Sequence, residues 1–229
     1  MAIKIAKAFS TDKQQWTGRN NETQRHGMTN HAPRLMVCLA VYAIIGCVAL
    51  ASSILVADFV VPNHDWIADT ISDLGAGRYE FIVDIGIYAF SGSLIALALL
   101  SSHQHLGDWR WSSGVVGLAL LGLIVFLVGA RNEYGDNDSE GVVIHVYLVY
   151  ALGVLFTAIP LLMADGARKV STTISVCLIA LAIAWTVFAP IFFFLPDTID
   201  GIYERFLGLI VMAIIIAFAL LFLRRARSL

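Results

Sequence analysis

Six long apolar runs dominate this sequence and limit its possible folds more than any other feature. Each run has eighteen or more residues with at most one acidic, basic or histidine side chain. An α-helix needs about 20 mostly apolar residues to cross the hydrocarbon core of a bilayer, and lipid cannot satisfy the backbone of an open strand or an irregular segment. The runs therefore predict an all-α, polytopic membrane protein. We place its six transmembrane helices at residues 35–57, 81–100, 112–130, 141–163, 170–195 and 202–223.

Composition supports this prediction. Of the 229 residues, 59% are hydrophobic and 14% are charged, whereas a soluble domain has roughly a quarter charged residues. The net charge is −2, so nothing in it points to a nucleic-acid partner. The expected partner is the lipid bilayer.

The distribution of charge predicts the orientation. With the N-terminus in the cytoplasm, 12 of the 15 Lys and Arg residues fall on the cytoplasmic side, and 13 of the 17 acidic residues fall on the other side. Lys and Arg favour the cytoplasmic side of membrane proteins. We therefore expect both termini in the cytoplasm, an acidic extracytoplasmic face, and a cytoplasmic-type membrane such as the bacterial inner membrane.

A single transmembrane domain, residues 35–225, follows a polar, basic segment at residues 1–34. The segment lacks the apolar core of a cleaved signal sequence. Met28 lies seven residues before the first predicted helix. Residues 1–27 are therefore expected to be either a mobile cytoplasmic tail or an over-long gene start.

The connection after the first apolar run predicts a short helix. Thr70 and Asp73 have the spacing of a capping box, and Gly75 is suited to end the turn in a left-handed conformation. We expect a helix at Ile71–Leu74 on the outer membrane surface, with Trp66 as an anchor at headgroup depth.

Three sequence features together resemble a known family. The segment Thr-Ile-Ser-Asp-Leu-Gly follows the first span, an acidic loop leads into His145, and Gly-Ile-Tyr-Glu-Arg at residues 201–205 begins the last span. This order resembles the domain of unknown function 998 family of multi-pass membrane proteins over residues 35–225. The resemblance implies a six-helix fold and no catalytic residues.

Topology brings a set of polar residues to the outer membrane surface, and we take them as a candidate ligand-binding cluster. Ionisable groups within a span usually face the bundle interior, which favours Asp84 and His145. Glu80, Asp84, Tyr88 and Ser91 also recur at helical spacing as one polar stripe. The cluster consists of Asp73, Arg78, Glu80, Asp84, Arg131, His145, Glu204 and Arg205.

Two functional interpretations of this cluster compete with a structural one. In the first, His64 or His145, with Asp73, Asp84 or Glu140, holds a divalent metal such as zinc for a membrane hydrolase, although the chain has no His-Glu-x-x-His motif. In the second, the stripe lines a cavity for a small solute, a lipid headgroup or protons, as in a small transporter, with an arginine holding an anion.

The third interpretation is structural, and we favour it for the individual residues. The even-numbered helices begin on the outer side, where acidic residues in the first turn are stabilised by the helix dipole at roughly 0.3–1 kcal/mol each. Arginines would pair with some of these acids. The sequence thus predicts a non-enzymatic integral membrane protein, either an accessory subunit of a membrane protein complex or a ligand-binding component. No cofactor is indicated.

Overall fold

The computed structural model describes residues 33–75, 78–130 and 144–229, and all regular secondary structure in these ranges is helical. The predicted tail and the acidic loop before His145 lie outside the described residues. The elements are a first helix Pro33–Val60, α2 Ile71–Leu74, α3 Glu80–Gln104, α4 Trp109–Ala130, α5 Ile144–Arg168, α6 Thr172–Phe188, the 3-10 helix η2 Ala189–Phe194, and α7 Asp200–Ala226.

Six of these helices are long and apolar enough to cross a membrane, which confirms the predicted number of spans. Several extend beyond the predicted ends. The first helix continues past Asp58 to Val60 and ends just before Pro62, because proline lacks the backbone N–H that would continue the helix. Pro190 similarly marks the change from α6 to η2.

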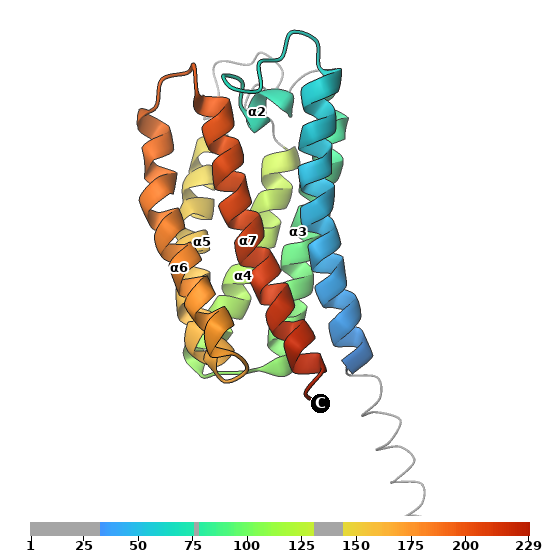
Figure 1. Cartoon of the computed structure of the whole chain (residues 1–229), viewed down its shortest axis with the longest axis vertical. Helices are drawn as coiled ribbons and strands as arrows, with labels where there is room; N and C mark the ends of the chain where they lie inside the picture. The colour runs from blue at the N-terminus through green and yellow to red at the C-terminus, as the bar shows by residue number, and fades with distance from the viewer. Residues whose placement is uncertain (1–32, 76–77, 131–143) are drawn as a thin grey trace, which may run out of the picture.

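The helices pack in chain order. α3 lies beside α4, α4 beside α5, α5 beside α6 and α6 beside α7. The first helix lies against α3 (Figure 1). We call the end with the 61–70 connection the acidic end, because it carries Asp58, Asp69 and Glu204, and the opposite end, with Arg168 and Arg224, the basic end. The C-terminus and the start of the first helix both lie at the basic end (Figure 1).

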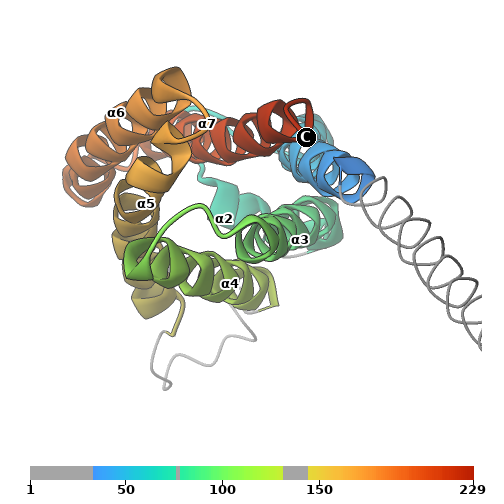
Figure 2. The same cartoon turned by 90° about the horizontal axis from the view of Figure 1, so that it is seen from below.

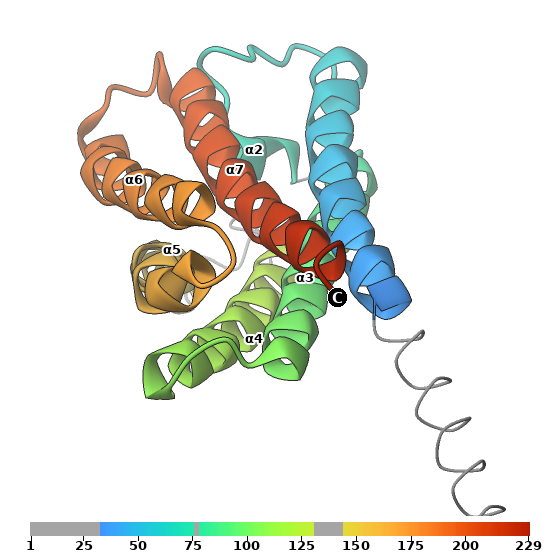
Figure 3. The same ribbon diagram turned by 60° about the horizontal axis from the view of Figure 1, so that its bottom comes forward.

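The first helix and α7 approach each other at the basic end and diverge towards the acidic end, where α2 lies between them (Figure 3). Seen from the basic end, α2 appears in the space enclosed by α3, α4, α5 and α7 (Figure 2). The short helix therefore covers the centre of the bundle at the acidic end.

Glycines allow the first helix to pack closely on α3. A Cβ atom at Gly46 would lie 2.5 Å from the backbone oxygen of Ala89, and one at Gly86 would lie 2.9 Å from the Cα atom of Leu50. Small residues permit such backbone approach between membrane helices, which gain van der Waals contact from it.

The capping box of α2 is confirmed. The Asp73 N–H donates to the Thr70 hydroxyl over 3.1 Å, and the Thr70 N–H donates to the Asp73 carboxylate over 2.7 Å. The prediction that Gly75 adopts a left-handed conformation is wrong. Its φ is −78°, and its N–H donates to the backbone oxygen of Ile71, as it would in a continuing helix. Among the described residues other than glycine, positive φ angles occur instead at Asn63, with φ 59°, and at His105, with φ 35°.

Candidate functional site

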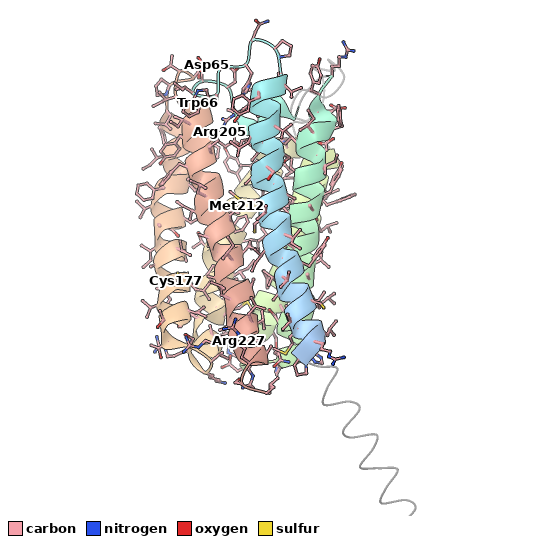
Figure 4. All side chains as sticks on the ribbon, turned by 45° about the vertical axis from the view of Figure 1, so that its right-hand side comes forward. Asp65, Trp66, Cys177, Arg205, Met212 and Arg227 are labelled. Carbon is pink, nitrogen blue, oxygen red and sulfur yellow. The ribbon has the colours of Figure 1, made fainter. Side chains whose placement is uncertain are left out.

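Arg205 joins three segments of the chain at the acidic end. It lies in the second turn of α7, and Figure 4 shows it between α7 and the first helix. Its guanidinium forms a two-point salt bridge with Asp58 of the first helix, in which Nε lies 3.4 Å from Oδ2. Its Nη1 donates to the backbone oxygens of Asp69, over 3.0 Å, and Gly201, over 2.9 Å. Such charge-assisted, two-point contacts are stronger than neutral hydrogen bonds.

His64 completes this cluster from the connection between the first helix and α2. Its side chain is 3% exposed. Nε2 lies 3.1 Å from Asp58 Oδ1 and 3.2 Å from Arg205 Nη2, while Nδ1 lies 3.3 Å from Asp69 Oδ2. We call Asp58, His64, Asp69 and Arg205 the tether cluster, because it ties the connection to two spanning helices.

Backbone contacts attach the same connection to the start of α7. The Gly201 N–H donates to the Ala68 oxygen over 3.1 Å, and the Ile202 N–H donates to the Ile67 oxygen over 3.0 Å. The free N–H groups of the first turn of α7 are thus used to hold the connection. The Glu204 carboxylate accepts the N–H of Ile71, so α2 is tied to α7 as well. A Cβ atom at Gly201 would lie 2.8 Å from the Asp69 carbonyl carbon, so this approach requires glycine.

Beneath this connection lies a cavity of about 1130 Å³ in the acidic half of the bundle. Ile71, Ser72 and Gly75 of α2 line it, and so do residues of all six spanning helices. Most of the lining is apolar. The apolar residues include Leu50, Ile54, Ile87, Phe90, Val125, Leu152, Phe156, Trp185, Leu207 and Met212.

The polar groups of the lining fall into two sets. Asp58, Glu204 and Arg205 belong to the acidic end, as does His145 in the first turn of α5. Deeper in the bundle, Thr157 and Thr186 hydrogen-bond each other over 3.0 Å. The cavity therefore offers an apolar interior with its charged groups at one end.

Exposed apolar residues also line the cavity, including Leu55 at 59%, Val154 at 68% and Leu209 at 62% exposure. These side chains belong to helices long and apolar enough to span a membrane, so part of the apolar lining is exposed at the level of the spans. The basic half of the bundle is filled instead. Trp111 and Phe222 are buried there, and the Trp111 indole N–H donates to the Ser101 oxygen over 2.8 Å.

The predicted cluster is divided by the structure. His145, Glu204 and Arg205 line the cavity, whereas Asp73 is used in the cap of α2. Arg78 lies 5.8 Å from the ring centre of its neighbour Tyr79, and Arg131 lies outside the described residues.

The predicted polar stripe on α3 faces α4. The Ser91 hydroxyl donates to the Gly122 oxygen over 2.7 Å, and the Tyr88 ring packs against Phe126 at 5.2 Å. Asp84 is half-buried, and its Oδ1 has no hydrogen-bond partner among the described residues. Asp84 is not among the residues that line the cavity.

The candidate cluster did not include Asp58 and Asp69, which the structure adds. Asp58 ends the first apolar run. An acid followed by Pro62 and His64 is a local signal of a polar helix end, although it does not indicate which residue the acid contacts.

In the described ranges, no group of three or more His, Cys, Asp or Glu residues has the arrangement of a metal site. His64 contacts Asp58 and Asp69, neither of which was among the carboxylates proposed to share a metal with it.

Six helices long and apolar enough to span a membrane, packed around an apolar cavity, define a multi-pass helical membrane protein. The model of the family described as protein of unknown function (DUF998) matches residues 44–221, and the chain belongs to this family. The resemblance predicted from the sequence motifs is thereby confirmed. Comparison with curated proteins and with solved structures gave no match.

Proposed function

We propose that this protein is a membrane-embedded binding protein whose cavity takes up an amphipathic, acyl-chain-containing molecule from the bilayer. The observation that supports the proposal is the cavity of about 1130 Å³, whose apolar lining includes strongly exposed side chains of the spanning helices. We take the cavity to open there to the hydrocarbon of the bilayer. Ligand pockets in proteins are about 300–1,000 Å³. The space therefore suits a ligand at least as large as a typical drug molecule.

The lining supports an amphipathic ligand rather than a small polar solute. Apolar walls favour a hydrocarbon chain because its transfer from water is favourable, at about 0.8 kcal/mol per buried CH₂ group. Polar atoms of His145, Glu204 and Ser72 at the acidic end could hydrogen-bond a headgroup. On the orientation proposed from the charge distribution, this end lies outside the cytoplasm, and the ligand comes from the outer leaflet.

The tether cluster supports a role for the connection as the cover of this site. Asp58 and Arg205 belong both to the cluster and to the cavity lining. A headgroup that contacts these side chains would also influence how the connection is held. We favour this binding role over an accessory subunit without a ligand, because an accessory subunit would not need an open internal space.

Two glycines allow the cavity to be filled without disturbing the helices. Gly153 on α5 and Gly208 on α7 both line the cavity, and a Cβ atom at either would meet no atom within 4 Å. We expect Gly153→Phe and Gly208→Phe to reduce the lipid that copurifies with the protein, measured by mass spectrometry of extracts from the detergent-purified chain, by about tenfold or more.

Val176→Phe is the matched control, since Val176 is a 55% exposed residue on α6 that does not line the cavity. It places the same phenylalanine side chain on an exposed face outside the cavity. If the two glycine variants retain the same amount and kind of lipid as Val176→Phe and the unchanged protein, the cavity is not the binding site and the proposal fails.

A further inference from the structure

A second hollow lies at the basic end, between the start of α6 and the end of α7, with a volume of about 330 Å³. It is lined by Ile174, Leu220, Leu223, Arg224 and Arg227. We propose that it binds an anionic phospholipid, with the phosphate at the two arginines and an acyl chain along the three apolar residues. This site is separate from the cavity and does not depend on the function proposed for it.

The contact between α6 and α7 places Arg224 beside the start of α6. Ser171 caps α6, and its hydroxyl accepts the Ile174 N–H over 3.4 Å. The same hydroxyl accepts a hydrogen bond from Arg224 Nη1 over 3.1 Å. Arg224 is therefore held next to the first turn of α6, where the helix dipole adds positive potential. Arginine is suited to phosphate because its planar fork presents several N–H donors together.

The charge around this hollow is unbalanced. Five cations lie at the basic end, where α5 and α7 end, namely Arg168, Lys169, Arg224, Arg225 and Arg227. Among the described residues, Asp108 and Asp165 are the acidic side chains at the basic end, and Asp165 pairs with Arg110 over 3.1 Å. No described carboxylate pairs with any of the five cations, and the Nε atom of Arg225 is buried without a hydrogen-bond partner. The charge therefore complements an anion.

The apolar wall distinguishes a phospholipid from free phosphate. Ile174, Leu220 and Leu223 belong to spanning helices and continue from the arginines into the apolar part of the bundle. A bound phospholipid would thus have its phosphate at headgroup depth and its acyl chain against these residues. Cations near an anionic membrane surface contribute about 1 kcal/mol each, which favours an anionic lipid over a zwitterionic one.

The test compares phosphatidylglycerol with phosphatidylcholine of the same acyl chains, titrated into the purified full-length chain and counted by native mass spectrometry. We expect preferential retention of phosphatidylglycerol, weakened about fivefold by Arg224→Gln or Arg227→Gln. Arg110→Gln is the matched control, because it removes one charge from the same end in an exposed ion pair. Equal retention of both lipids, or equal weakening by Arg110→Gln, would overturn the proposal.

A second arm separates lipid from free phosphate. Leu223→Trp should fill the apolar part of the hollow and reduce phosphatidylglycerol retention, while inorganic phosphate at millimolar concentration should displace little of the lipid. If inorganic phosphate displaces the lipid completely and Leu223→Trp has no effect, the site recognises phosphate alone and the phospholipid assignment is wrong.

Discussion

Arg205 shows how one side chain can hold an extramembrane segment on a membrane bundle. Its contacts reach Asp58 in the first helix, the Asp69 backbone in the connection, and Gly201 in its own helix. Hydrogen bonds to charged groups contribute about 1.5–3 kcal/mol each. The connection that covers the cavity therefore depends strongly on this residue.

We expect Arg205→Lys to loosen the connection while leaving the spanning helices intact. Lysine keeps the charge but cannot form the two-point contact with Asp58 and reach the Asp69 oxygen at the same time. Amide hydrogen exchange of residues 67–71 should become about tenfold faster, as measured by mass spectrometry. Arg78→Lys serves as the control, since Arg78 is exposed at the same end. Unchanged exchange in Arg205→Lys would show that the backbone contacts alone hold the connection.

Of the four residues of the tether cluster, the sequence singled out His64 and Arg205 but not Asp58 and Asp69. The reason is physical. Hydropathy and helix length place Glu204 and Arg205 at the start of the last span, where the structure has them, but they specify depth and not position around the bundle. Asp58 and Arg205 are 147 residues apart. Their pairing depends on how the first helix and α7 pack. The same limit explains why His145 lines the cavity whereas Asp84 does not.

At the scale of elements, local interactions were predictable and packing was not. The capping box of α2 involves residues three apart, so its pattern is visible in the sequence. The conformation of Gly75 was not predictable in this way, because it depends on where the chain goes after α2. Likewise, a glycine in a span permits close packing, but the sequence does not identify the backbone that approaches it.

Gly46→Ala should destabilise the contact between the first helix and α3. Its Cβ atom would lie 2.5 Å from the backbone oxygen of Ala89, so one helix must move, and overpacking of this kind costs about 1–3 kcal/mol. We expect a lower unfolding temperature in detergent, followed by tryptophan fluorescence. Gly208→Ala is the comparison, because its Cβ atom would meet open space. If the two variants unfold at the same temperature, the close approach of these helices is not a source of stability.

The whole molecule is asymmetric along the membrane normal. The acidic half contains the cavity, its cover and the tether cluster. The basic half has a buried core around Trp111 and Phe222 and carries five cations that pair with no described carboxylate. The two halves would therefore meet different leaflets. The cavity can receive a ligand from one leaflet, and the hollow beside Arg224 can contact the other. Which leaflet each half meets depends on the orientation of the chain, and the distribution of charge predicts this orientation.

Cysteine labelling tests that orientation. In a variant without the three native cysteines, Thr198→Cys places an exposed thiol at the acidic end and Ser228→Cys places one at the basic end. Seven of the nine Lys and Arg residues that the structure describes lie at the basic end, namely Arg34, Arg110, Arg168, Lys169, Arg224, Arg225 and Arg227. The positive-inside preference therefore predicts that this end is in the cytoplasm. A membrane-impermeant maleimide should therefore label Thr198→Cys in intact cells and Ser228→Cys only after permeabilisation. The opposite pattern would reverse the proposed orientation, and with it the leaflet assigned to the cavity, while leaving the six-helix fold unchanged.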